Sequence, residues 1–124
     1  MSGIKHLRST SDFRRVYACG KRYESHLMMA FVEPNGLKHH RFGITASRKA
    51  IGNAVERNRS KRLIRESFRL SKTALDDLGG KYDWVLNARR ALLSVKAETS
   101  LEEFKAIIAR VAKNEQSDPL KEDG

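Results

Sequence analysis

The stretch from Arg48 to Arg69, RKAIGNAVERNRSKRLIRESFR, predicts a long basic helix. Asn53 has a side chain suited to an N-cap, and neither Gly nor Pro follows it until Gly79, so we expect the helix to run from about Asn53 to about Asp77. Eight Lys or Arg residues stand against two Glu residues, which gives this stretch +6 of the formal net charge of +10. The helix is therefore the main basic element of the chain.

This helix separates into an apolar and a basic face when successive residues are placed about 100° apart. The side chains expected to pack on a core are Ser60, Leu63, Ile64, Ser67, Phe68 and Leu70. The adjoining face, called the basic face below, carries Asn58, Lys61, Arg62, Arg65 and Arg69, with Arg57 and Arg59 at the borders of the apolar face.

A charged helix face is often simply solvated, and this interpretation remains open. Here Glu56 and Glu66 are the only acidic residues of the stretch, and like charges four residues apart repel each other by roughly 0.2–0.5 kcal/mol. A polyanion would relieve that repulsion, and Arg side chains match phosphate oxygens in geometry. Together with a pI of about 10.1, the basic face favours binding to a nucleic acid.

Length and composition indicate one folded domain. With 124 residues, of which 40% are hydrophobic, we expect a single domain over residues 1–113 and a polar tail over residues 114–124. Cys19 is the only cysteine, so it has no intramolecular disulfide partner. No apolar run approaches the roughly 20 residues of a membrane span, and no secretory segment begins the chain. We therefore expect a cytoplasmic protein.

The remaining segments predict an α+β fold in the order α-β-β-(β)-α-β-α, with a small mixed sheet packed with helices. We expect a first helix over residues 11–19 and strands over residues 23–33, 41–47 and 82–88, the second antiparallel to the first. Residues 91–97 are open between a loop and a short turn. A final helix capped by Thr99 or Ser100 closes the sheet. The strand–helix–strand connection should be right-handed by the general rule.

The chain offers no convincing catalytic or metal site. Glu56 and Glu66 lie about three turns apart on the predicted helix, too far to share a Mg²⁺ ion. His39 and His40 are adjacent in a predicted loop, and no His/Cys pair has the spacing of zinc ligands. We therefore expect a binding protein without catalytic or metal-ligating residues.

Two further groups of residues lie outside the basic helix, one of basic pairs and one of aromatic side chains. Arg48 and Lys49 follow the second strand and Arg89 and Arg90 follow the third, so both pairs reach one edge of the sheet if these strands are parallel neighbours. Ordinary solvated strand ends are the alternative. Among the aromatic residues, Phe13 and Tyr17 lie one helical turn apart, and Phe31 lies on a strand that is apolar on both faces. Spacing alone favours packing of these rings in the core.

The basic segment also resembles a known motif. Residues 54–66, AVERNRSKRLIRE, with SRK and IGN before them, resemble the RNR motif of the protein subunits of bacterial ribonuclease P. The resemblance extends to DFRRVY at residues 12–17, GKR at residues 20–22, RFGI at residues 41–44 and residues 83–90, and it covers about residues 5–113.

The resemblance implies a function and a fold. In bacterial ribonuclease P the RNA subunit carries out Mg²⁺-dependent hydrolysis of precursor tRNA at the 5′ end of the mature sequence. The protein binds the 5′ leader and the catalytic RNA, assists substrate recognition and broadens the range of substrates. The chain would then be an enzyme only as a subunit. The resemblance implies one protein per RNA and no cofactor on the protein's own side chains. The resemblance also implies a left-handed crossover, against the general rule.

Site residues follow from the resemblance position by position. RNA contacts are implied for Arg57, Asn58, Arg59, Lys61, Arg62 and Arg65 of the motif. A leader-binding cleft is implied for Phe13, Tyr17 and Phe31, although the family often has Phe at the position of Tyr17 and Tyr at that of Phe31. Both differences keep the aromatic ring.

Two other classes of protein remain as alternatives. A ribosomal or other structural RNA-binding protein would share the charge and the α/β build, but not the combination of the RNR helix with Phe13, Tyr17 and the Arg89–Arg90 pair. A helix-turn-helix DNA-binding protein needs a short recognition helix after a tight turn, whereas the basic helix here follows a strand.

Overall fold

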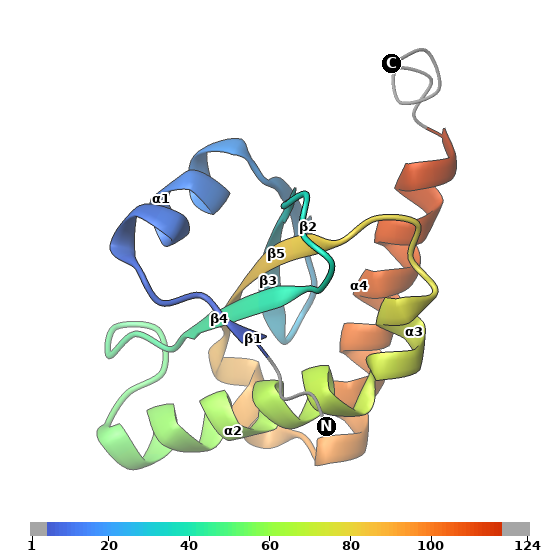
Figure 1. Cartoon of the computed structure of the whole chain (residues 1–124). Coiled ribbons are helices and arrows are strands. Elements are labelled where there is room, and N and C mark those ends of the chain that lie inside the picture. Colours follow the sequence, from blue (N-terminus) through green and yellow to red (C-terminus); the bar gives the residue numbers. More distant parts are fainter. Residues whose placement is uncertain (1–4, 118–124) are drawn as a thin grey trace.

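A five-stranded mixed sheet forms the centre of the molecule in the computed structural model, which describes residues 5–117 (Figure 1). The strands lie in the order β1-β4-β5-β3-β2. Their bounds are β1 Lys5–His6, β2 Lys21–Glu24, β3 Met28–Pro34, β4 Arg41–Thr45 and β5 Tyr82–Ala88. Strands β1, β4 and β5 run parallel to one another, and β3 is antiparallel to β5 and to β2.

Helices cover both faces of this sheet. Their bounds are α1 Thr10–Cys19, α2 Ala54–Leu70, α3 Lys72–Asp76, a 3₁₀ helix η1 Arg90–Ser94, and α4 Ala97–Ser117. Helix α1 packs on one face, and α2 and α4 pack on the other face and against each other (Figure 1). Alternate residues of β5 divide accordingly, because Val85 contacts the side chains under α1 while Trp84 and Leu86 belong to the larger core under α2 and α4. The predicted α+β class is confirmed.

Helix α2 begins as its sequence predicts. The Asn53 side chain accepts a hydrogen bond from the Glu56 backbone N–H at 2.9 Å, and Glu56 Oε1 accepts one from the Asn53 backbone N–H at 3.2 Å. This capping box satisfies two backbone donors that the helix itself leaves unpaired. Gly52 before it has a φ of +129°, a value that side chains other than Gly rarely adopt.

The end of the basic helix differs from the prediction. Instead of running to Asp77, the helix ends at Leu70, and α3 begins after Ser71. The Ser71 hydroxyl donates to the Ser67 carbonyl at 2.7 Å. Ser side chains that bond nearby backbone carbonyls in this way compete with the backbone hydrogen bonds of a regular helix. Leu70 is 48% exposed, so the prediction that it packs in the core is wrong. It lies seven residues after Leu63, at the border of the apolar face, in the last turn.

Aromatic rings join α2 to the sheet and to α4. Phe68 stacks on Phe42 with ring centroids 4.3 Å apart, and Phe104 lies 5.5 Å from Phe68 and 5.6 Å from Trp84. Burial of such large side chains contributes about 1.5–3 kcal/mol each relative to exposure. This packing fixes α2 along β4, with the basic face turned away from the core.

Residues 23–33 form two strands and not the single strand that we expected. Residues 25–27 turn the chain between β2 and β3, where the Ser25 hydroxyl accepts hydrogen bonds from the backbone N–H groups of Leu27 and Met28, each at 3.2 Å. Leu27 is nevertheless buried, so the apolar pattern continues through the turn and conceals it. Strand β1 was not expected either.

Helix α4 also differs at its ends. It begins at Ala97, before the caps expected at Thr99 or Ser100, and Ser100 is instead buried with its hydroxyl 2.7 Å from that of Ser67. The helix runs to Ser117, four residues into the expected polar tail. Residues 118–124 lie outside the described residues. The undecided segment over residues 91–97 contains most of η1.

Strands β4 and β5 are parallel neighbours, with Phe42 opposite Trp84. Strand β4 runs antiparallel to β3, as expected, but β5 lies between the two. The connection from β4 to β5 passes through α2 and α3, and its left-handed crossing stays a prediction. Within residues 5–117, no helix combines the length and the apolar character needed to cross a membrane.

Candidate nucleic-acid interface

The aromatic residues predicted to form a cleft lie on the face of the sheet under α1. Phe13 and Phe31 are half-buried and pack against the small cluster of Leu7, Val16 and Val85. The Phe13 ring lies directly on the backbone of Gly43, because a Cβ atom added there would come within 2.3 Å of the ring. Any side chain larger than Gly at position 43 would push the ring away from the sheet. Phe13 therefore packs in the small core under α1 while part of its side chain stays exposed to solvent.

Tyr17 is the most exposed of these three rings, at 40%. Its ring meets the edge of Phe31 in a T-shaped arrangement with centroids 4.9 Å apart. Its hydroxyl donates to Asn87 Oδ1 at 2.9 Å, and the Thr45 hydroxyl donates to the same oxygen at 2.7 Å. These bonds fix the Tyr17 ring over the sheet beside Phe31 and leave two-fifths of the residue open to solvent.

A hollow of about 200 Å³ connects this face with the basic helix. The hollow is lined by His6, Leu7, Phe13, Phe42, Gly43, Ile44, Lys61 and Arg65. It brings Phe13 together with two cations of the basic face, Lys61 and Arg65. Tyr17 and Phe31 do not line it, but they lie on the same face of the sheet.

Electrostatics in this hollow is dominated by cations. Burial, and then the charges of Arg65 and Arg8, lower the pKa of His6 below its usual 6.5, so the ring is neutral at pH 7. The His6 ring also contacts Phe42 with centroids 4.8 Å apart. A neutral ring beside Phe13, Lys61 and Arg65 combines stacking surfaces with phosphate-binding groups, as single-stranded nucleic acids require.

The basic face divides into paired and unpaired cations. Arg69 forms a salt bridge with Glu66, and Arg57 donates to the Gly52 carbonyl at 3.0 Å. Across residues 5–117, no carboxylate lies within 4.0 Å of the charged groups of the other four motif cations, which are Arg59, Lys61, Arg62 and Arg65. Asn58 is exposed beside them. The unpaired cations keep their full attraction for an external anion.

The two basic pairs at the strand exits have different surroundings. Since β4 and β5 are parallel neighbours, both pairs do follow strands at one edge of the sheet. Arg48 and Lys49 are exposed. Arg89 donates to the Ser25 carbonyl at 3.0 Å, whereas Arg90 donates to the Ile51 carbonyl just before α2. Arg89 and Arg90 thus also support the fold, and their side chains reach different segments.

An ion cluster under α1 was missed from the sequence. The Asp83 carboxylate is fully buried and accepts hydrogen bonds from Arg41 Nε at 2.8 Å and Arg41 Nη2 at 2.7 Å, from Asn35 Nδ2 at 2.9 Å, and from Arg15. Arg15 also donates to Glu33 at 2.8 Å. The cluster joins α1 to strands β3, β4 and β5. A lone Asp in the apolar strand YDWVLNA was the one available signal.

Burial alone would raise the pKa of Asp83. The hydrogen bonds from Arg41 and Asn35, together with the charges of Arg41 and Arg15, outweigh it and hold the pKa below the usual 3.8. Asp83 is therefore ionised at pH 7, and it neutralises part of the charge of Arg15 and Arg41. These two arginines therefore have a structural role.

His40 is held as a neutral ring. Its Nδ1 accepts hydrogen bonds from the Tyr82 backbone N–H at 3.0 Å and from Trp84 Nε1 at 3.1 Å, so the ring proton resides on Nε2, which donates to the Leu75 carbonyl at 3.1 Å. Burial is the main cause that lowers the pKa of His40. In the described part of the chain, no three His, Cys, Asp or Glu side chains gather in a group that could hold a metal ion.

Comparison with known proteins identifies the family of this chain. The sequence model of the Ribonuclease P family matches residues 1–112. The "Ribonuclease P protein component" of Methylococcus capsulatus is 41% identical over 95 residues, which cover 77% of this chain and 71% of the relative. That of Caldanaerobacter subterraneus is 35% identical over 112 residues, which cover 90% and 93%.

Solved structures have the same fold. The RNase P protein of Staphylococcus aureus superposes with a TM-score of 0.73 at 27% identity, covering 90% of this chain and 97% of that one. The RNase P protein of Thermotoga maritima superposes with a TM-score of 0.74 at 29% identity, covering 86% and 96%. The match covers nearly the whole of both solved chains. The chain therefore belongs to the Ribonuclease P family of protein components.

Proposed function

We propose that this chain is the protein subunit of a ribonuclease P holoenzyme, that it binds the 5′ leader of precursor tRNA and the catalytic RNA, and that the RNA carries out Mg²⁺-dependent hydrolysis. Membership of the family supports the first part. The observation that carries the binding mode is the hollow in which Phe13 lies beside Lys61 and Arg65, two cations without a carboxylate partner among residues 5–117.

The leader is expected to bind across the α1 face of the sheet. A single-stranded RNA exposes its base faces, and stacking on an aromatic side chain contributes about 1–3 kcal/mol per base. Tyr17, Phe31 and the exposed edge of Phe13 provide such surfaces. Lys61 and Arg65 belong to α2, which packs on the other face, and they meet Phe13 in the hollow that joins the two sides. Bases would contact the rings and phosphates would contact the cations.

The rest of the basic face is expected to bind the catalytic RNA. Arg59 and Arg62 are exposed on α2 and have no carboxylate within 4.0 Å among residues 5–117. Asn58 adds an amide donor next to them, and Arg57 lies at the start of the helix. Arg48 and Lys49, exposed before that start, would extend the contact, with Arg89 and Arg90 contributing from the other strand exit.

Catalysis is assigned to the RNA from the family resemblance, and among residues 5–117 the acidic groups do not gather into a site that could hold Mg²⁺. Mg²⁺ takes carboxylate and other oxygen ligands, usually with a phosphate. The carboxylates nearest the aromatic face, Asp12, Glu33 and Asp83, all bind Arg15. No step of hydrolysis is therefore derived through a metal ion on this chain.

Reconstitution tests the proposal. The chain is added to a ribonuclease P RNA with precursor tRNA at a Mg²⁺ concentration too low for cleavage by the RNA alone. We expect cleavage at the 5′ end of the mature sequence to be restored, with saturation at one protein per RNA. A structural RNA-binding protein would bind without restoring cleavage, and that result would reject the proposal.

A further inference from the structure

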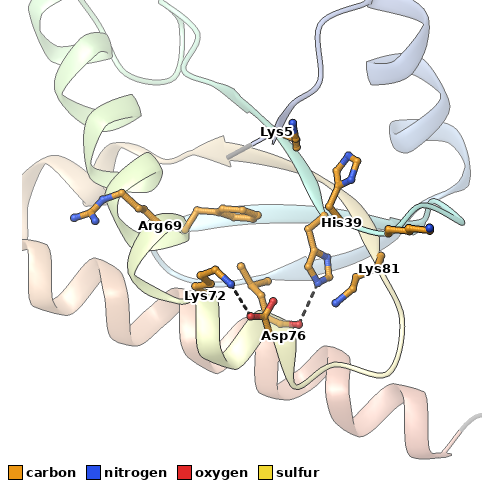
Figure 2. Close-up of a pocket in the computed structure, with 10 residues that line it drawn as sticks. Lys5, His39, Arg69, Lys72, Asp76 and Lys81 are labelled. Atoms are coloured by element: carbon orange, nitrogen blue, oxygen red, sulfur yellow. Dashed lines mark hydrogen bonds and ion pairs between the residues drawn. The ribbon is translucent and has the colours of Figure 1, made fainter. Parts of the chain in front are cut away.

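A second, larger hollow of about 380 Å³ lies at the other end of α2, on the α2 and α3 side of the sheet (Figure 2). Its lining includes five Lys or Arg residues that come from distant parts of the sequence, namely Lys5, Lys38, Arg69, Lys72 and Lys81. Asp76 is the one carboxylate in the lining. None of the lining residues belongs to the RNR motif, and Phe13, Tyr17 and Phe31 do not line the pocket.

The loop that forms one wall of the pocket is fixed in place. Gly36 has a φ of +67°, which suits Gly, and it allows the tight turn after β3. Asn35 Oδ1 accepts from the Leu37 backbone N–H at 2.8 Å, and Asn35 Nδ2 donates to the His39 carbonyl at 3.2 Å. The next residue, His40, is bonded to Leu75 of α3 on the opposite wall. Lys38 and His39 therefore lie in a preformed loop.

Three of the cations form no ion pair among residues 5–117, although Lys81 is near enough to Asp76 to lower the pKa of that carboxyl. Lys72 is paired with Asp76 at 2.9 Å, and Arg69 is paired with Glu66. Lys5, Lys38 and Lys81 have no carboxylate within 4.0 Å among residues 5–117. Like charges around one hollow repel each other, and the fold gains nothing from gathering them. An anion between them would remove that cost.

Phe68 and Leu75, both largely buried, contribute the apolar part of the pocket lining. Its volume falls within the range of about 300–1,000 Å³ that is typical of ligand pockets. A cavity with cations on one side and apolar side chains on the other matches a nucleotide, which joins a charged phosphate to an aromatic base whose flat faces can lie against apolar side chains.

Continuity with the first hollow favours RNA as the occupant. Lys61 and Arg65 line the first hollow, and Arg69, one turn further along α2, lines the second. Strand β1 lies between the hollows, since His6 lines the first and Lys5 the second. One strand of RNA that follows α2 would pass from the first hollow to the second.

We propose that this pocket binds one nucleotide of a single-stranded RNA segment, with the phosphate between Lys38 and Lys81 and the base against Phe68 and Leu75. The inference rests on the proposed function in that the RNA belongs to the same holoenzyme. It adds an RNA contact at the C-terminal end of α2, outside the motif.

Lysine footprinting of the wild-type chain tests the pocket directly. The chain is acetylated with and without ribonuclease P RNA, and modification is measured at each lysine by mass spectrometry. We expect the RNA to protect Lys38 and Lys81 at least fivefold, while Lys105 and Lys113, exposed on α4, stay reactive. Reactivity of Lys38 and Lys81 equal to that of the α4 lysines would overturn the inference. Equal protection by inorganic phosphate at the same phosphate concentration would overturn the assignment to an RNA strand.

A pair of double variants removes equal charge at two places. Lys38→Ala with Lys81→Ala is compared with Lys105→Ala with Lys113→Ala for affinity to the RNA at several salt concentrations. Each lost contact with single-stranded RNA reduces the magnitude of the log–log salt slope by about 0.7. We therefore expect the slope of the pocket variant to be smaller in magnitude than that of the α4 variant by about 0.7–1.4. Equal slopes for the two variants would show that the pocket does not contact the RNA.

The outcome is separable from that of the proposed function. If the wild-type chain fails to restore cleavage at low Mg²⁺, the proposed function is wrong, whatever the footprint. If cleavage is restored and precursor tRNA still binds more tightly than mature tRNA, but Lys38 and Lys81 are unprotected, this inference alone is wrong.

Discussion

Arginines on the two faces of the sheet have opposite surroundings. Under α1, Arg15 and Arg41 both bind the buried carboxylate of Asp83, and Arg15 also binds Glu33. On α2, Arg62 and Arg65 are exposed, and no carboxylate of residues 5–117 lies within 4.0 Å of either. The same residue type thus joins elements of the fold in one region and is left available to a ligand in the other. Partners, and not residue type, distinguish the two roles.

The largest expected effect is on the paired side. Asp83→Ala leaves the charges of Arg15 and Arg41 without their shared partner, and breaking such a buried pair costs about 3 kcal/mol. We expect the free energy of unfolding, measured by urea denaturation, to fall by about that amount. As a matched control, Arg62→Ala should change it by less than about 0.5 kcal/mol. Equal losses in the two variants would remove the distinction between the faces.

Next in size is the effect of the unpaired side on RNA affinity. Arg62→Ala with Arg65→Ala should weaken binding to ribonuclease P RNA by tenfold or more and reduce the log–log salt slope by about one to two, since each contact contributes about 0.7. The affinity is measured between 50 mM and 200 mM salt, with Lys105→Ala and Lys113→Ala as the control of equal charge. A slope that does not change would place these arginines outside the interface.

A third, smaller effect concerns the aromatic surface between these regions. Tyr17→Ala should weaken binding of precursor tRNA by about tenfold and leave mature tRNA nearly unaffected, because only the precursor has a leader to stack on the ring. Tyr17→Phe keeps the ring but loses the hydrogen bond to Asn87, and it should bind nearly as the wild type does. If Tyr17→Ala and Tyr17→Phe each weaken the binding of precursor and of mature tRNA by the same factor, the Tyr17 ring has a role in the fold only.

The smallest effect is a pH dependence of stability due to His40. Its pKa is lowered below 6.5 in the folded chain, chiefly by burial, and Lys81 adds to the shift while Asp76 opposes it. Below pH 6.5 the unfolded chain therefore binds a proton that the folded chain does not. Stability is fully present above pH 6.5 and declines as the pH falls toward the folded pKa.

Thermal unfolding at pH 7.5 and pH 5.5 measures this dependence. We expect a lower Tm at pH 5.5, and a smaller difference between the two pH values in His40→Gln. The exposed His39 serves as the control, because His39→Gln should keep the full difference. His6 shifts in the same direction, so His6→Gln is measured alongside. An unchanged pH difference in His40→Gln would contradict the assignment.

Local signals in the sequence were enough for several elements. Asn53 and Glu56 specify the start of α2 through neighbouring backbone groups, and β5 is a largely apolar run that follows the break at Gly79 and Gly80. The sequence predicted poorly where tertiary contacts override local preference. Ser100 looked like a helix cap but bonds Ser67 across the α2–α4 interface, and Leu27 hid the β2–β3 turn because it is buried within it.

The candidate site was predictable only in part for a related reason. The basic face could be derived from helical spacing, and the resemblance suggested the aromatic rings. Lys61 and Arg65 share a hollow with Phe13 because α2 packs along β4. Residue spacing within the helix does not predict that packing. The pairing of Asp83 with Arg15 and Arg41 joins residues 68 and 42 positions apart, a separation that no local pattern specifies.

The central place of β5 determines the order in which the nascent chain can fold. Strands β3 and β4 both pair with β5 and not with each other, so neither can complete the sheet before residues 82–88 leave the ribosome. Until then Arg15 and Arg41 lack Asp83. Pairings across such long separations are slow to form, because a large loop must be closed first. The sheet, and with it the pairing of Arg15 and Arg41 with Asp83, is therefore complete only once β5 lies between β3 and β4.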